Sequence, residues 1–270
     1  MSRKSLRPAA WLAGALLLTL GLPAAAAAVA PPPVTLRAAL DPEQLGESTT
    51  VSVGFQIASP PGQLPSPLTE FDVRLPAGMG LAATTLGLET CSTEALLRGG
   101  VTGCSVESRM GFGSASVEAS LGSQLVNESA RVSILMGQPI AGHTTMLYYF
   151  EGKAPVIAPL VFPSEVLSVA NSPTSEFDTA IPPIPALPGS PDVSILSLRA
   201  SIGPNHLTYY KHVHGHLVGY RPIGMSVPPT CPRGGFVFSG EFGFQDGAHT
   251  TATTTVACPR SAHSRGGARR

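Results

Sequence analysis

The chain has few charged side chains and no excess of either sign. Charged residues make up 13% of its 270 positions, about half the share of typical soluble domains, and 17 basic side chains balance 17 acidic ones. A net charge of zero leaves no basic footprint for nucleic acid and no acidic footprint for cationic partners. We therefore expect no nucleic-acid partner, whereas a hydrophobic share of 43% is enough to build a substantial core.

Several catalytic and metal-binding motifs are missing. The stretch GFGSAS (111–116) places Gly-x-Gly before Ser114 but no glycine two residues after it, so it is not a nucleophile elbow. The same stretch continues without the Lys-Ser/Thr ending of a phosphate-binding loop. No Cys-x-x-Cys pair is present, which argues against zinc held by the cysteines. The acidic residues are few and scattered, so we expect no enzyme; a secreted glycan hydrolase is a distant alternative.

The longest apolar run lies at the N-terminus. A basic start (MSRKSLR) precedes an uncharged core (AAWLAGALLLTLGL), and small residues follow Pro23. This order is typical of a secretory signal peptide, and the core is shorter than the roughly 20 residues that span a bilayer. We predict a signal peptide at 1–28, with cleavage between Ala26 and Ala30. An uncleaved membrane anchor is the alternative. We expect no transmembrane segment in the mature chain, which is then secreted or held at the cell surface.

Four cysteines fit an oxidising compartment and allow three pairings. Cys91 and Cys104 flank STEALLRGG, which predicts a short helix at about 92–98 that begins at a Ser92 cap and ends at Gly99. This proximity predicts a Cys91–Cys104 disulfide.

The other two cysteines belong to a predicted C-terminal hairpin. Asp246-Gly247 fills a two-residue turn, which places Gln245 opposite Ala248 and Gly235 opposite Cys258. Cys231 lies four residues before Gly235, so a flexible CPRGG segment can return it to Cys258. We therefore predict a second disulfide between Cys231 and Cys258.

Alternation of apolar and polar residues dominates the chain and predicts strands. Helices between strands are missing, which excludes parallel crossover units. We predict an all-β fold, an antiparallel β-sandwich in two lobes. The strands are expected at 34–40, 48–58, 68–76, 114–121, 130–136, 144–150, 192–202 and 206–220, followed by the C-terminal hairpin.

The proline-rich stretch IPPIPALPGSP (181–191) is the best internal boundary. It separates a first lobe at 34–180 from a second lobe at 192–258, although a long loop within one sandwich is also compatible with it. The remaining residues, 259–270, are basic and lack apolar periodicity, so we predict a disordered tail.

Two stretches resemble uncharacterised secreted β-sandwich proteins of high-GC bacteria: FDVRLPAGMGLAATTLGLETCSTEALLRGGVTGCSVESRMGFGSASVE and CPRGGFVFSGEFGFQDGAHTTATTTVACP. The first contains a Leu-Pro-x-Gly turn, a Cys-to-Cys helical loop and a small-residue strand, and the second is similar to the terminal hairpin of that group. The resemblance implies an extracytoplasmic, immunoglobulin-like fold. It implies no catalytic residue and no ligand.

The stretch HLTYYKHVHGHLVGY (206–220) holds four of the seven histidines. Its glycines, aromatic and β-branched residues favour a strand over a helix. On one strand, alternate positions point the same way. Leu207, Tyr209, Val213 and Leu217 then face the core, and Thr208, Tyr210, His212, His214 and His216 face solvent, with His206 at the edge.

Outward-facing histidines at i and i+2 can share one metal ion. We therefore keep zinc or copper binding by His212, His214 and His216 as an alternative to a solvated polar row, and a mildly acid-sensitive surface as a third interpretation. A tight metal site needs another ligand, for which His249, Asp246 and Glu241 are candidates. The leading prediction is a non-catalytic binding or structural module at the cell envelope, with no cofactor and with an unidentified envelope or extracellular partner.

Overall fold

The computed structural model describes residues 31–81, 85–121, 123–152, 159–169, 172, 174–184 and 193–259. The predicted signal peptide, most of the connector and nearly all of the predicted tail lie outside these residues. The strands are β1 (Val34–Asp41), β2 (Ser48–Ile57), β3 (Leu68–Arg74), β4 (Gly80–Leu81), β5 (Arg109–Leu121), β6 (Gln124–Met136), β7 (Thr144–Gly152), β8 (Pro159–Ser168), β9 (Ser175–Ala180), β10 (Ser194–Ile202), β11 (Tyr209–Val213), β12 (His216–Tyr220), β13 (Met225–Ser226), β14 (Phe236–Phe244) and β15 (His249–Val256). The helical segments are α1 (Thr93–Gly99), η1 (Gly100–Gly103) and η2 (Val106–Ser108).

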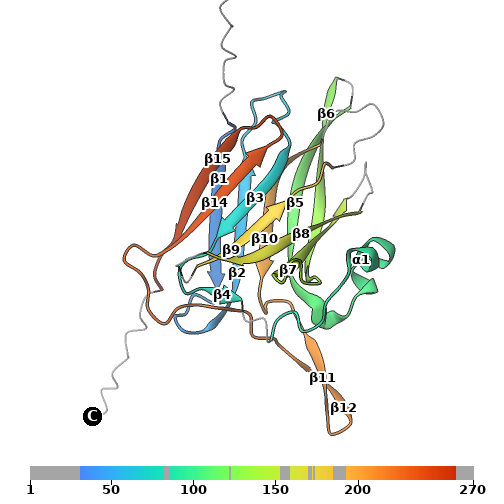
Figure 1. The fold of residues 1–270 in the computed structure, drawn as a ribbon, viewed down its shortest axis with the longest axis vertical. Helices are drawn as coiled ribbons and strands as arrows, with labels where there is room; N and C mark the ends of the chain where they lie inside the picture. Colours follow the sequence, from blue (N-terminus) through green and yellow to red (C-terminus); the bar gives the residue numbers. More distant parts are fainter. Residues whose placement is uncertain are drawn as a thin grey trace, which may run out of the picture.

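One antiparallel sheet of 13 strands folds round on itself to form both layers of a β-sandwich (Figure 1). Its order is β15-β14-β3-β9-β8-β7-β6-β5-β10-β2-β13-β4, and β1 also pairs with β2. The sheet curves so far that β1, which pairs with β2, lies beside β15 at the other end of the strand order. The predicted all-β sandwich is therefore confirmed.

The expected division into two lobes is wrong. The late strand β10 lies between β5 and β2, and the late strand β14 pairs with β3. Strands from both sides of the proline-rich stretch thus alternate in one sheet and bury one common core. Splitting the chain at 181–191 would leave each part with unpaired strand edges and half a core.

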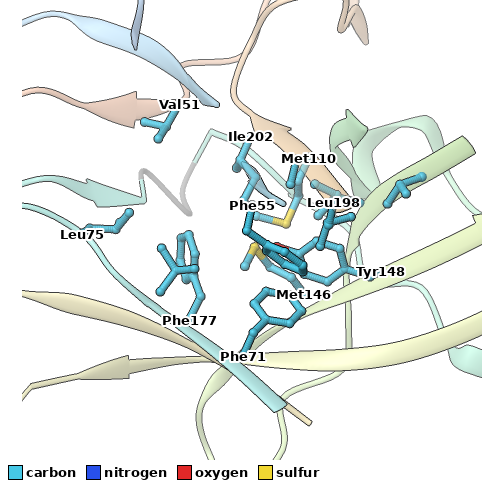
Figure 2. Close-up of a cluster of buried hydrophobic side chains, with 14 of the residues drawn as sticks. Val51, Phe55, Phe71, Leu75, Met110, Met146, Tyr148, Phe177, Leu198 and Ile202 are labelled. Atoms are coloured by element: carbon cyan, nitrogen blue, oxygen red, sulfur yellow. The ribbon is translucent and has the colours of Figure 1, made fainter. Parts of the chain in front are cut away.

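Aromatic side chains join the two layers (Figure 2). The ring of Phe55 on β2 lies 5.4 Å from Phe71 on β3 and 5.1 Å from Phe242 on β14, measured between centroids. Phe71 also meets Tyr148 of β7 edge to face at 6.3 Å. These contacts place β2 face to face with β3 and β14, so the outer surfaces of the two layers point in opposite directions.

The short helix begins as predicted. The Ser92 hydroxyl accepts a hydrogen bond from the Ala95 N–H at 3.1 Å, which satisfies one of the free donors of the first turn. Leu96 is fully buried against Leu147 and Tyr149 on the outside of β7. Within the part of the chain that the structure describes, we find no helix with the length and apolarity needed to traverse a bilayer.

Both predicted disulfides are confirmed. Cys91 and Cys104 are bonded with their Cα atoms 5.6 Å apart, and this bond ties α1 and η1 to the strand edge. Cys231 and Cys258 are bonded with their Cα atoms 5.8 Å apart. The second disulfide joins the segments at the open end of the β14–β15 hairpin.

The register of that hairpin differs from the prediction by one position. Phe244 N–H donates to the Ala248 carbonyl at 3.0 Å, so the loop has three residues, 245–247, and Gln245 does not face Ala248. Gly247 has a φ of +81°, the left-handed conformation that a three-residue hairpin loop requires near its end.

Candidate functional site

The histidine-rich stretch forms a hairpin and not the predicted single strand. We call β11 and β12 with their connecting turn the arm. His214 and Gly215 make the turn with φ values of 49° and 81°, and positive φ at both central residues defines the type I′ turn that two-residue hairpins prefer. The arm is a separate two-stranded sheet that projects from the sandwich (Figure 1).

This reversal separates the histidines. Because directly opposite residues share a face, His216 lies with Val213 on one face of the arm, and His212 lies with Leu217 on the other. His214 occupies the turn. Nowhere among the described residues do three His, Cys, Asp or Glu side chains gather as a metal site would require. The predicted row of three histidines is thus wrong.

The expected further ligands do not join the arm either. His249 lies on β15, where its Nδ1 is 3.6 Å from a carboxylate oxygen of Glu70 on β3. Glu241 on β14 is 3.1 Å from the Arg74 guanidinium, and the Asp246 carboxylate accepts from the Ala248 N–H within its own loop. The predicted core face of the strand is correct only at its start, since Leu207 and Tyr209 are buried and Val213 and Leu217 are exposed.

A different cluster of polar side chains lies on the outer face of β1, β2, β10, β5 and β6. Cross-strand pairing aligns one residue from each strand in a single row: Arg37, Gly54, Arg199, Ser114 and Arg131. Three of the five positions are arginine. The row ends on β7, where Glu151 is opposite Arg131.

A hollow of about 920 Å³ lies over this row. We call it the arginine hollow. Its lining includes Arg37 and Arg199, the ring of Phe112 and no carboxylate. Four serines contribute hydroxyls to it: Ser52, Ser114, Ser197 and Ser201. The hollow is therefore basic and rich in hydrogen-bond donors.

Gly54 forms the floor between the two arginines. A Cβ at this position would lie 2.9 Å from the Leu198 carbonyl oxygen and 3.4 Å from the Arg199 Cα. Any side chain here would both crowd the backbone of β10 and fill the space between the guanidinium groups. The missing side chain leaves that space open.

Neither Arg37 nor Arg199 has an ion-pair partner among the described residues, although Arg74 has two, Glu176 and Glu241. Both unpaired arginines are exposed. Exposed guanidinium groups without a protein carboxylate remain free to bind an external anion, to which each can donate two parallel hydrogen bonds.

The opposite layer presents acidic side chains. Strands β8, β9, β3 and β14 contribute one acid each to a cross-strand row: Glu165, Asp178, Asp72 and Glu241. Glu70 and Glu176 flank this row, and we call the six side chains the acidic face. Like charges directly opposite one another on a sheet destabilise it, so the fold tolerates repulsion here.

Asp72 shows the effect of this environment. Partial burial, together with the charges of Asp178, Glu176 and Glu70, raises the pKa of the Asp72 carboxyl from 3.8 to about 6. A hydrogen bond from the Thr179 N–H, at 3.3 Å, opposes the shift in the pKa and does not cancel it.

Sequence reasoning missed the arginine hollow. The sequence places each of these arginines at an outward-facing position of a predicted strand. Alternation of apolar and polar residues does not reveal the order of the strands in the sheet, so it could not show that the arginines are neighbours.

Comparisons with protein families, with curated proteins and with solved structures each found no match to this chain. The resemblance to secreted proteins of high-GC bacteria and the immunoglobulin-like assignment therefore stay predictions.

Proposed function

We propose that the protein is a secreted, disulfide-stabilised binding module of the cell envelope, and that it holds an anionic ligand in the arginine hollow. The two unpaired guanidinium groups of Arg37 and Arg199 over the bare backbone of Gly54 are the observation that supports this function. The predicted N-terminal signal peptide supports export, and two disulfides are consistent with an oxidising compartment.

The spacing of the arginines restricts the ligand. Arg37 and Arg199 lie on strands that flank β2, so their backbones are about 9.5 Å apart. Two arginine side chains at this spacing can converge on one anion or bind neighbouring charges of a longer ligand. An elongated ligand with repeated carboxylate or phosphate groups uses the row more fully, because Arg131 extends it beyond Ser114. The serine hydroxyls supply further donors to the ligand.

The test is the binding of the full chain to defined polymers by isothermal titration calorimetry. Polygalacturonate provides carboxylates, polyphosphate provides phosphates, and dextran is the neutral comparison. Charged hydrogen bonds contribute about 1.5–3 kcal/mol each, so Arg37→Ser with Arg199→Ser should weaken binding of the preferred polyanion by at least about a hundredfold. Added NaCl should weaken it as well, because the groups are exposed.

Arg98→Ser is the matched control. Arg98 is an exposed arginine on α1, 3.4 Å from Glu94, so its loss removes one positive charge away from the hollow, as Arg37→Ser alone removes one within it. Equal binding by the native chain and the double variant would refute the proposal. So would equal losses in Arg37→Ser alone and in Arg98→Ser, because the effect would then be one of total charge.

A further inference from the structure

The arm exposes apolar side chains away from the core. Leu217 is 62% exposed and Val218 is 42% exposed, and Tyr210 and Val213 are also exposed. Side chains of this type cluster on a surface mainly where it contacts a partner or a membrane. Because the arm projects from the sandwich (Figure 1), these side chains form an unpartnered apolar surface.

The apolar side chains occur on both faces of the arm. Leu217 shares one face with His212, whereas Val218 shares the other with Lys211. A flat partner would cover one face of a two-stranded sheet and leave the other in water. A medium that surrounds the arm on all sides would cover both.

The charge of the arm has one sign. The segment 206–224 contains Lys211, Arg221 and histidines, and it contains no aspartate or glutamate. The Lys211 ammonium lies 5.2 Å from the centre of the Tyr220 ring, so it stays on the arm beside the exposed valines. The partner should therefore combine apolar material with negative charge.

The base of the arm is held firmly. Tyr209 is completely buried; its hydroxyl accepts from the Gly87 N–H at 2.9 Å and donates to the Arg109 carbonyl. The Tyr210 N–H donates to the Glu107 carboxylate at 3.3 Å. The arm is thus presented from a fixed base, and its tip extends beyond the sandwich.

We propose that the arm inserts into the headgroup region of an anionic lipid surface. Five residues per strand give it a reach of about 16 Å. Its outer strand edges have unpaired backbone groups, which confine it to the hydrated interface and exclude the hydrocarbon centre. Lys211 and Arg221 attract anionic headgroups, while Leu217 and Val218 enter the boundary with the acyl chains. This interaction does not depend on the arginine hollow.

A tryptophan at the tip tests the insertion directly. The native chain has one tryptophan, Trp11, within the predicted signal peptide, so Leu217→Trp in the mature chain gives a single reporter on the arm. With vesicles of phosphatidylglycerol and phosphatidylcholine, emission should move to shorter wavelength, and lipids brominated near the headgroup should quench it. The control is Val237→Trp in the same mature chain, because Val237 is 52% exposed on β14; its emission should stay unchanged.

The charges provide the second measurement. In the reporter chain, Lys211→Ser and Arg221→Ser should each weaken partition into the anionic vesicles about fivefold, and together about 25-fold. Vesicles of phosphatidylcholine alone should give a much smaller change in emission.

Three results would overturn the proposal. One is unchanged emission of the Leu217→Trp reporter with anionic vesicles. Another is equal partition into neutral vesicles. The third is an oligomer of the native chain in sedimentation velocity without lipid that Leu217→Ser abolishes, since the arm would then dock on a second copy.

Discussion

Asp72 provides the sharpest test of the energetics of the acidic face. Its carboxyl is half-buried on β3 directly opposite Asp178 of β9, and burial is the main reason that its pKa rises to about 6. In the unfolded chain the carboxyl has its ordinary pKa of 3.8. Between pH 4 and 6 the native protein therefore binds a proton that the unfolded chain has released, and stability falls as the pH rises.

The magnitude follows from the difference between these two pKa values. A difference of about two pKa units between the folded and unfolded chain corresponds to roughly 3 kcal/mol of unfolding free energy without screening. Solvent screening of a half-exposed group reduces this to about 1 kcal/mol. Asp72→Asn keeps an oxygen that can accept from the Thr179 N–H and removes the charge. We expect the variant to be about 1 kcal/mol more stable than the native chain at pH 7.5 and equally stable at pH 3.5.

Urea unfolding at a series of pH values from 3.5 to 8 measures this difference. The control is Glu43→Gln, at an exposed position without an ion pair in the described structure; its stability difference from the native chain should stay near zero at every pH. A difference between Asp72→Asn and the native chain that does not change with pH would refute the reasoning. A variant less stable than the native chain at pH 7.5 would refute it too.

Two further predictions concern the stability of the fold. Tyr209→Phe should lower the free energy of unfolding in urea by about 1–3 kcal/mol, because it leaves the Gly87 N–H and the Arg109 carbonyl without their buried partner; an unchanged midpoint would show that water replaces the hydroxyl. Replacing Cys231 and Cys258 by serine should lower the free energy of unfolding by about 3.5 kcal/mol, because the disulfide closes a loop with a sequence separation of 27 residues. A fall in the melting temperature no larger than that of an ordinary surface variant would contradict this expectation.

Local patterns predicted most of the strands. Alternation is a property of neighbouring residues, so it located β1, β2, β3, β7 and β10 to within a few positions. It failed at β8, where Pro159 and Pro163 argue against a strand. The structure accommodates Pro163 because, among the described residues, the backbone pairing of β9 with β8 is limited to residues 165–168.

Turn chemistry explains the error in the histidine-rich stretch. The alternation of apolar and polar residues continues through residues 206–220, and a two-residue alternation does not show where the chain reverses. His214-Gly215 adopts the conformation usually encoded by Asn-Gly or Asp-Gly, so a histidine at the first turn position gave no clear signal for the reversal. One reversed turn placed His212 and His216 on opposite faces of the arm, so the single row on which the alternative metal site depended does not form.

The arginine hollow depends on long-range pairing that sequence alternation does not encode. Arg37 and Arg199 are distant in the chain and become neighbours only because β10 inserts between β5 and β2. Each arginine by itself reads as an ordinary outward-facing strand residue. The same holds for Asp72 and Asp178, whose repulsion arises only when β3 and β9 are adjacent.

A formal charge of zero conceals two patches of opposite charge. Since Phe55 packs on Phe71 and Phe242, the arginine hollow and the acidic face point away from each other on the two layers of the sandwich. Within the described residues, the two outer surfaces therefore carry local charges of opposite sign. Near a polyanionic surface, the protein should orient so that the arginines approach first. It should also bind to both cation- and anion-exchange resins at the same neutral pH.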